Sequence, residues 1–291
     1  MVIQTEKLTK YYGNSRGIEE INLSVKEGEV FGFLGPNGSG KTTTIRILLD
    51  FIRPSSGRAR LFGLDAHTDS VRIKSRIGYL PGEYGMYEKM KAGDYLQFLG
   101  SLRSDEKPPM KDKLIELFDV DISKRIKSFS HGNKQKLALV QAFMHDPELL
   151  ILDEPTNGLD PLIQQRFYEL ILELKESGKT IFFSSHILSE VERICDRVAI
   201  LREGKLVALH KISDLKKFRL KSIEVTFKHE LDESIFRLDG VRKVEKNANA
   251  VHLLINANIN GILRKISEYP IDYISCRDAS LEDIFLEYYT Q

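Results

Sequence analysis

A glycine-rich segment near the N-terminus has the residue types and spacing of a phosphate-binding loop. It fits the pattern G-x-x-x-x-G-K-[ST], in which glycines let backbone N–H groups approach phosphate oxygens closely. The matching residues are Gly35, Pro36, Asn37, Gly38, Ser39, Gly40, Lys41 and Thr42, followed by Thr43. A glycine-rich turn that binds nothing is the alternative, but a chance match to four fixed positions is rare. The pattern therefore predicts a site for nucleotide phosphates.

The flanking residues predict the structure that this loop requires. The apolar run at residues 30–34 is typical of a buried strand, and residues 42–51 are typical of a helix that begins at the loop. A helix N-terminus presents unpaired N–H groups and the positive end of its dipole to an anion. We expect Lys41 to contact the β- and γ-phosphates of ATP, and the Thr42 hydroxyl to bind Mg²⁺.

A second chemical motif consists of four apolar residues, 149–152, followed by the carboxylates of Asp153 and Glu154. So short an apolar run favours a strand buried on both faces of a parallel sheet. Open α/β sheets bind ligands at the carboxyl ends of their strands, so we expect Asp153 to hold the Mg²⁺ shell. Glu154 is then placed to act as general base on the attacking water. A strand that ends in an exposed acidic turn is the structural alternative.

Four further segments resemble motifs of the ATP-binding-cassette (ABC) ATPases and follow them in the family's order. Residues 129–133 resemble the signature segment, and residues 157–160 resemble the D-loop. Residues 184–186 resemble the switch-histidine segment, and residues 8–13 resemble the aromatic loop that stacks on adenine. With the phosphate loop and the acidic pair, these motifs cover roughly residues 1–215. The chain is identified as a member of this family.

The resemblance implies that the signature segment serves a second cassette. The Ser130 hydroxyl, the Gly132 N–H and the dipole of their helix would bind the γ-phosphate held by the other subunit's phosphate loop. Asp160 of the D-loop would belong to the same nucleotide site. Without the resemblance, Ser130 predicts only the cap of the following helix.

The resemblance also assigns two single residues. His186 would hydrogen-bond the γ-phosphate and orient the attacking water with Glu154. Tyr12 would stack on the adenine, because it is the residue before Gly13 that matches the family pattern. The structural alternatives are an ordinary histidine at a strand end and an aromatic residue on an edge strand.

Two positions depart from the family pattern. The family places a Gln after the strand that corresponds to residues 77–81, where it contacts Mg²⁺; this chain has Gly82, followed by Glu83. A carboxylate is a competent Mg²⁺ ligand, so Glu83 is expected to replace the Gln with a shift of one residue. His131 stands where the signature usually has a Gly, and it leaves Ser130 and Gly132 in place.

The global properties exclude several classes of protein. The chain has 291 residues and a formal net charge of +1 at pH 7, so it has no basic footprint for nucleic acid. The two cysteines, Cys195 and Cys276, lie outside any metal-binding or redox spacing and are expected to be reduced and packed. No secretory N-terminus and no apolar run near 18 residues is apparent. We therefore expect a cytoplasmic protein, peripheral on the inner face of the membrane through a partner.

The coarse pattern of elements alternates strand and helix, which indicates an α/β architecture with a mostly parallel core sheet. The expected strands are residues 30–34, 77–80, 149–152, 180–184 and 197–201, and the expected helices are residues 42–51, 93–101, 134–145, 163–177 and 189–195. Residues 2–5, 21–25 and 58–62 favour an antiparallel β flank. Residues 69–129 resemble the helical subdomain by which ABC cassettes bind a transmembrane partner.

Residues 1–215 are predicted to form the ATP-binding cassette, and residues 216–291 a small accessory α+β domain. The second domain has expected strands at 223–227, 241–246, 251–255 and 271–277 and a helix at 260–268. Its last residues resemble the ending of ATP-binding subunits from drug-, antibiotic- and sodium-exporting ABC systems. Ser280 with Asp283 also resembles a capping box for a final helix.

The sequence thus predicts the ATP-hydrolysing subunit of an ABC transporter, paired with a second cassette and a separate multi-span permease, and directed to export. The alternative is a soluble ABC-type switch that acts in assembly or on ribosomes. A single phosphate loop and the lack of a long heptad insertion disfavour that alternative. A catalytically silent module is disfavoured because Lys41, Asp153, Glu154 and His186 are all present.

Overall fold

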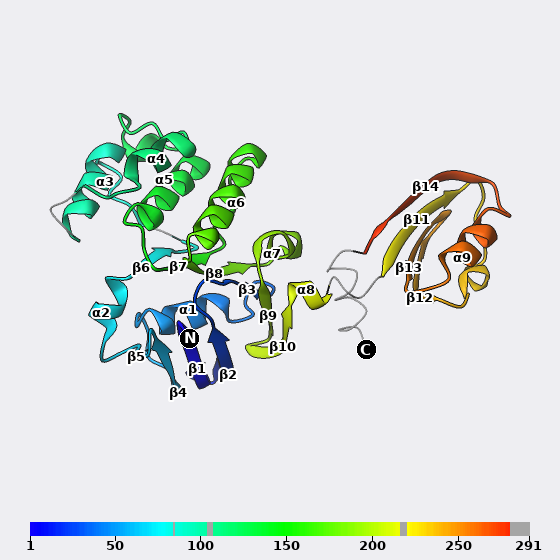
Figure 1. The fold of residues 1–291 in the computed structure, drawn as a ribbon, viewed down its shortest axis with the longest axis horizontal. Coiled ribbons are helices and arrows are strands. Elements are labelled where there is room, and N and C mark those ends of the chain that lie inside the picture. Colours follow the sequence, from blue (N-terminus) through cyan, green and yellow to red (C-terminus); the bar gives the residue numbers. More distant parts are fainter. Residues whose placement is uncertain (84, 104–106, 216–219, 280–291) are drawn as a thin grey trace. The chain divides into compact units, whose positions relative to one another are not determined.

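The computed structural model of the protein describes residues 1–83, 85–103, 107–215 and 220–279 (Figure 1). Contacts within the chain divide it into two compact units, Met1–His210 and Lys211–Gln291. This division assigns the short helix α8, Ile212–Leu215, to the second unit, whereas the sequence pattern predicts a boundary after residue 215.

A six-stranded sheet forms the centre of the first unit, in the order β10-β9-β3-β8-β7-β6. Strand β3 pairs in parallel with β8 and β9, and β7 pairs in parallel with β6 and β8. The bounds are β3 Val30–Leu34, β6 Ile77–Leu80, β7 Leu149–Asp153, β8 Thr180–Ser185, β9 Arg197–Arg202 and β10 Lys205–Lys211. Every residue of β3, β7 and β8 is buried, which is why these strands are nearly continuous apolar runs in the sequence.

Packed aromatic rings fill the space beside the central strands. The Phe182 ring lies 5.9 Å from that of Phe31 and 5.0 Å from that of Phe33, centroid to centroid, and all three side chains are fully buried. Burial of each such side chain contributes about 1.5–3 kcal/mol to folding. The core therefore holds β3 and β8 rigidly, together with the loops that leave their carboxyl ends.

A second, antiparallel sheet has the order β2-β1-β4-β5 and confirms the predicted flank. Its strands are β1 Ile3–Tyr12, β2 Ser15–Val25, β4 Ser56–Leu61 and β5 Leu64–Asp65. Strands β1 and β2 are much longer than predicted. Three register shifts interrupt their pairing, the first between Thr5 and Leu8, so the alternation of polar and apolar residues that marks a strand is broken.

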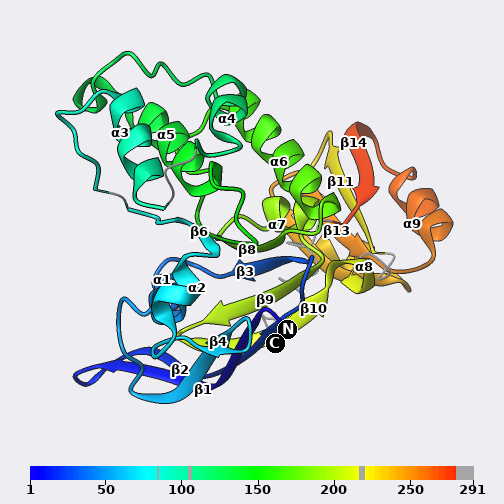
Figure 2. The ribbon, with the colours of Figure 1, turned by 60° about the vertical axis from the view of Figure 1, so that its left-hand side comes forward.

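Helices cover both faces of the parallel sheet. In Figures 1 and 2, α3–α6 lie together on one side of it, and α1 lies on the other side with the antiparallel sheet. The bounds are α1 Lys41–Leu48, α2 Ser70–Lys74, α3 Ala92–Ser101, α4 Lys111–Leu117, the 3₁₀ turn η1 Ile126–Ser128, α5 His131–Phe143, α6 Pro161–Glu176 and α7 Leu188–Ile194. Among the described residues, no helix has both the length and the apolar character needed to cross a bilayer.

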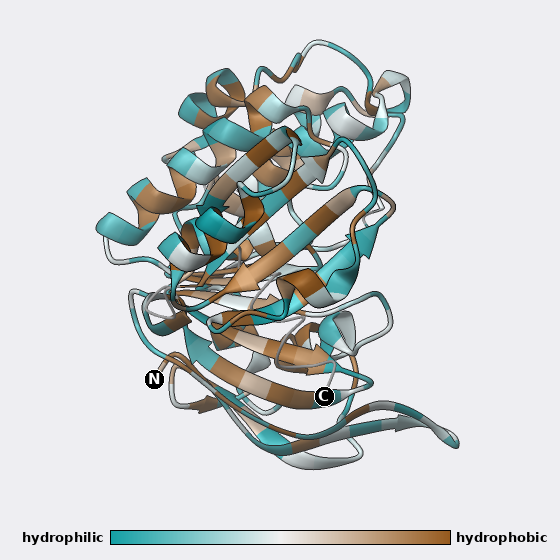
Figure 3. Cartoon of the chain, turned by 90° about the vertical axis from the view of Figure 1, so that its right-hand side faces the viewer, coloured by the Kyte–Doolittle hydropathy of each residue, from teal (hydrophilic) through white to brown (hydrophobic). Residues whose placement is uncertain are grey.

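The second unit contains an antiparallel sheet in the order β12-β13-β11-β14. Its elements are β11 Lys221–Phe227, the 3₁₀ turn η2 Glu233–Phe236, β12 Val241–Asn247, β13 Ala250–Ile255, α9 Ile259–Ile266 and β14 Ile271–Asp278. Alternate residues of β11 and β13 pack with Phe236 and Ile262 into a separate core. Figure 3 shows hydrophobic residues, in brown, along the strands. The predicted final helix and its capping box lie outside the described residues.

The cysteine prediction is half right. Cys195 is buried, and its burial raises the pKa of the thiol well above the usual value. Cys276 is exposed, because it lies on β14, which is an outer strand of its sheet.

Candidate active site

The chemical motifs meet at one edge of the parallel sheet because neighbouring parallel strands end together. Leu34, the last residue of β3, pairs with Ser185 of β8, and Asp153 of β7 pairs with Ser184. The phosphate loop, the acidic pair and the switch-histidine segment therefore leave the sheet side by side. This is the carboxyl edge at which open α/β sheets bind ligands.

The loop of residues 35–40 has the backbone of an anion cradle. Gly38 and Gly40 have φ of 78° and 105°, in the region that glycine adopts at little cost. A side chain at Gly35 would meet the Ser39 Oγ atom at 2.5 Å. That Oγ is the one buried side-chain polar atom without a hydrogen-bond partner among the described residues. A phosphate oxygen would supply the missing partner, so the loop fits the group that its sequence predicts.

Lys41 begins α1 and folds back over the loop. Its Nζ atom donates to the carbonyl oxygens of Gly35 at 2.6 Å and Pro36 at 3.3 Å. The same Nζ lies 3.3 Å from the Glu154 Oε1 atom, and only 5% of the lysine side chain is exposed. The ammonium group is thus fixed above the cradle by backbone acceptors and a carboxylate.

Asp153 joins two of the motifs. Its Oδ2 atom accepts from the Thr42 hydroxyl at 2.8 Å, and its Oδ1 atom accepts from the Ser184 hydroxyl at 2.5 Å. Asp153 is almost fully buried. Hydroxyl and carboxylate oxygens are the ligands that Mg²⁺ takes from proteins, so Thr42 and Asp153 form a suitable pair. Among the described residues no group of three His, Cys, Asp or Glu side chains could hold a metal.

Glu154 lies between the lysine and the histidine. Its Oε1 atom is 3.3 Å from Lys41 Nζ and 3.3 Å from His186 Nδ1. Its backbone has φ of 51°, and its N–H donates to the carbonyl oxygen of Ser184 at 3.2 Å. His186 is 44% exposed and Glu154 20%, so both side chains are open to a ligand above the loop.

Tyr12 lies beside the start of α1. A side chain at Gly17 would meet the Tyr12 ring at 2.9 Å and the Thr43 methyl at 3.3 Å, so both residues flank that glycine. Lys10 Nζ lies 5.4 Å from the ring centroid, and the ring is 47% exposed. The ring is available for stacking, which is the role that the sequence predicts for it.

Ser130 is the N-cap of α5, as the structural alternative requires. Its Oγ atom accepts from the Asn133 N–H at 3.3 Å, which explains why the helix begins at His131 rather than at the predicted Lys134. Asp160 is likewise the N-cap of α6, where its Oδ1 atom accepts from the Ile163 N–H at 3.0 Å. A capping role does not occupy all lone pairs of either side chain, so it is compatible with a further ligand.

The first turn of α5 packs directly on the D-loop of the same chain. A side chain at Gly132 would meet the Gly158 carbonyl oxygen at 2.8 Å, and one at Gly158 would meet the His131 ring at 2.4 Å. The His131 imidazole therefore lies against the D-loop backbone. His131, which departs from the family pattern, thus packs against Gly158. The sequence did not predict this contact.

Gly82 is close to the acidic pair. A side chain there would lie 3.4 Å from the Asp153 Oδ2 atom, which is ordinary contact, so this position faces the proposed metal ligands. Glu83 is exposed and follows directly in the chain.

Sequence reasoning missed Ser184 as a member of the site. Its hydroxyl donates to Asp153, and its carbonyl oxygen accepts from the Glu154 N–H. Its position at the carboxyl end of a buried strand was the available signal, because a serine in such a run requires a polar partner.

Comparisons with known proteins agree with this geometry. A family model described as ABC transporter matches residues 18–157. The bacitracin transport ATP-binding protein BcrA of Bacillus licheniformis is 42% identical over 226 residues, which are 77% of this chain and 74% of that protein. An ABC transporter ATP-binding protein of Bacillus subtilis, YhaQ, is 34% identical over an alignment that covers 98% of both chains.

Solved structures lead to the same family. One described as the ATP-binding subunit of an ABC transporter superposes with a TM-score of 0.69 at 28% identity, over 75% of this chain and 92% of that one. The predicted fold class is confirmed by this likeness and by the sheet topology. The chain therefore belongs to the ATP-binding, ATP-hydrolysing subunits of ABC transporters, and its sequence is similar to those of antibiotic transport systems.

Proposed function

We propose that the protein drives export through a separate membrane permease by hydrolysing ATP between two cassettes. The observation that supports the hydrolysis in this proposal is the placement of Glu154 within 3.3 Å of both Lys41 and His186 at the edge of the phosphate loop. Two relatives, 42% and 35% identical to this chain, are named for bacitracin transport and for linearmycin resistance. These names support export of antibiotic-like compounds.

The residues divide the chemistry among them. Lys41 and the N–H groups of the loop hold the phosphates, and Tyr12 stacks on the adenine. Thr42 and Asp153 would hold Mg²⁺, which neutralises charge on the phosphates when bound. Glu154 takes a proton from the attacking water, and His186 holds that water and the γ-phosphate in line.

The signature residues are proposed to serve a second cassette. Ser130 and the Gly132 N–H lie at the N-terminus of α5 and pack on the D-loop, while the phosphate loop lies at the edge of the sheet. We infer that they bind the γ-phosphate held by a second copy or a paralogue, together with Asp160. ATP would then close two cassettes, and hydrolysis would reopen them.

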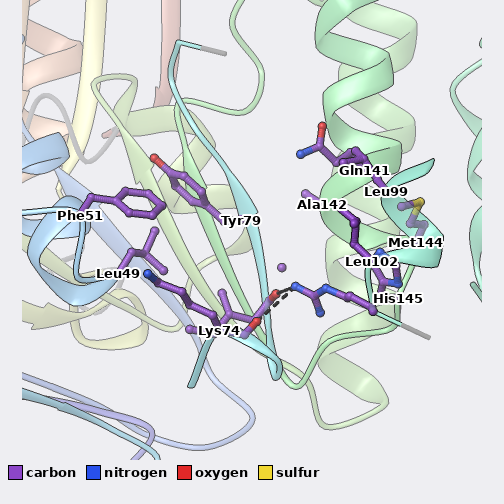
Figure 4. A pocket seen from close by; sticks show the side chains of 13 residues that line it. Leu49, Phe51, Lys74, Tyr79, Leu99, Leu102, Gln141, Ala142, Met144 and His145 are labelled. Carbon is purple, nitrogen blue, oxygen red and sulfur yellow. Dashed lines mark hydrogen bonds between the residues drawn. The ribbon is translucent and has the colours of Figure 1, made fainter. Parts of the chain in front are cut away.

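A groove in the first unit is suited to the permease. A cavity of ≈ 250 Å³ lies between the β6 region and helices α3 and α5, and Figure 4 shows Phe51 and Tyr79 on one side of it and Leu102 and His145 on the other. Burial and the nearby Arg103 charge lower the pKa of His145 to about 4, so its imidazole is neutral at pH 7. A largely apolar groove of this kind fits an apolar helix from a cytoplasmic loop of the permease.

The groove provides the test of the proposed function. Leu102 lines it and is 66% exposed, so Leu102→Glu should leave the ATPase rate of the isolated subunit unchanged. Co-expressed with the proposed multi-span permease, the variant should no longer co-purify with it, because a charge would be buried in the contact. Leu172→Glu on α6, outside the groove, is the matched control. Normal co-purification of both variants would contradict docking at the groove, and no co-purification of the parent chain would favour a soluble switch.

The loop after β6 gives a second prediction. If Glu83 has taken over the Mg²⁺ contact, Glu83→Ala should weaken Mg²⁺-dependent hydrolysis far more than Gly82→Ala does. Gly82 faces Asp153, so Gly82→Gln in the Glu83→Ala background should restore hydrolysis by returning an amide oxygen to the metal. Titration of the ATPase rate with Mg²⁺ measures both effects. Equal and mild losses from the two alanine variants would mean that the loop has no metal role.

A further inference from the structure

Helix α7 buries a carboxylate that none of the motifs includes. Glu190 is 6% exposed, although it lies four residues after His186 on a short helix that is acidic in its first turn. Its Oε2 atom accepts from the Ser185 hydroxyl at 2.6 Å, and its Oε1 atom accepts from the hydroxyls of Thr156 at 2.5 Å and Tyr168 at 3.0 Å. Burying a carboxylate is costly unless its oxygens are hydrogen-bonded, and here both oxygens are.

One of the three donors fixes the turn that carries the histidine. Ser185 immediately precedes His186, and its Oγ atom accepts from the Ile187 N–H at 2.9 Å while it donates to Glu190. The backbone on both sides of His186 is thus tied to one buried carboxylate. The His186 imidazole itself remains 44% exposed.

The second donor fixes the chain after the general base. Thr156 lies two residues beyond Glu154, and its carbonyl oxygen accepts from the Leu159 N–H at 3.1 Å in the D-loop. The preceding carbonyl oxygen, of Pro155, accepts from the buried Gln135 side chain of α5 at 2.7 Å. Glu190 therefore connects the histidine turn to a segment that also contacts the signature helix.

The third donor anchors the carboxylate to the scaffold. Tyr168 lies on the long helix α6, and the Arg193 guanidinium stacks over its ring at 4.4 Å. Burial and the neighbouring carboxylate raise the pKa of the Tyr168 phenol, so it remains a hydrogen-bond donor.

We propose that Glu190 is a positioning residue that holds His186 and the D-loop in register with Glu154. It acts through the hydroxyls of Ser185 and Thr156 and does not touch the nucleotide. The inference rests on the proposed role of His186 in hydrolysis. It predicts a loss in turnover without a loss in ATP binding, because none of the three hydroxyls that donate to Glu190 belongs to the phosphate loop.

The first test is Glu190→Gln, which keeps the size of the side chain but replaces one of its two acceptor oxygens with an NH₂ group. The kcat for ATP hydrolysis should fall about 10–100-fold, as expected when a reacting group is displaced by about 1 Å. The Kd for ATP should change by less than about twofold, since the contacts that bind ATP before the reaction are not altered. Glu192→Gln, on the same helix and outside this network, should behave as the parent. An unchanged kcat in Glu190→Gln would overturn the proposal.

A second variant keeps the carboxylate and so covers the case in which Glu190→Gln does not fold. Thr156→Val removes one hydroxyl with little change of shape and should lower kcat, whereas Thr156→Ser retains the hydroxyl and should restore it. Equal kcat values for the Val and Ser variants would count against the network.

A double-mutant cycle separates positioning from general destabilisation. If Glu190 acts through His186, the combined Glu190→Gln/His186→Ala variant should be little slower than His186→Ala alone. Fully multiplicative losses would show that Glu190 does not act through His186 and would overturn the proposal. If His186→Ala and Glu154→Gln both hydrolyse ATP normally, the catalytic roles proposed for His186 and Glu154 fail, and that outcome is distinct from a failure of Glu190 alone.

Discussion

Replacing Glu154 with Gln is expected to slow ATP turnover about 10²–10⁴-fold, the usual loss when a general base is removed. The amide cannot take the proton from water, yet it keeps the shape of the side chain between Lys41 and His186. ATP binding should therefore persist, and the trapped nucleotide should favour a closed dimer. Steady-state ATPase assays, nucleotide-binding titration and size exclusion with ATP measure the three effects.

Glu203 offers a matched control for this substitution. It is a glutamate with φ of 49°, close to the 51° of Glu154, and it lies in the turn between β9 and β10. Glu203→Gln should hydrolyse ATP at the parent rate. Turnover by Glu154→Gln at that same rate would reject the assignment of Glu154 as general base.

Lys41→Ala should instead weaken the binding of ATP itself. The lysine is the buried cation of the phosphate loop, and its removal deletes a charge-assisted contact to the phosphates that contributes about 1.5–3 kcal/mol. The Kd for ATP should rise about 10–150-fold. Isothermal titration with ATP measures the loss, and circular dichroism checks that the variant is folded.

Lys179→Ala is the control for losing a largely buried lysine. Lys179 Nζ donates to the Asp146 carbonyl oxygen at 3.0 Å, and 19% of its side chain is exposed. Its removal should leave the Kd for ATP unchanged. A Kd for Lys41→Ala equal to that of the parent would show that Lys41 does not contribute to phosphate binding.

The parallel sheet was predictable because burial on both faces leaves an uninterrupted apolar run, as in β3 and β7. The residues at the ends of those strands could be assigned for the same reason, since parallel neighbours end at one edge. The second unit was predictable from the alternation in β11 and β13, where one face of the sheet packs on a core.

The remaining features depend on information that local patterns do not carry. The extent of β1 was underestimated, because bulges shift its register against β2 and β4. From its local sequence, Glu190 would be predicted to be an ordinary acidic residue on the surface of a helix. Its burial depends on three hydroxyls from elements far apart in the chain, which no periodicity reveals.

The backbone conformation of Glu154 lowers the stability of the fold at a residue that the proposed hydrolysis needs. A φ of 51° is a left-handed conformation that costs a residue with a Cβ atom about 1–2 kcal/mol relative to ordinary helical geometry, and glycine adopts it with little cost. By backbone cost alone glycine would be the more stable residue at position 154, whereas the proposed hydrolysis needs the carboxylate of glutamate. Stabilising screens that ignore activity should accumulate changes at this position and yield robust but inactive cassettes.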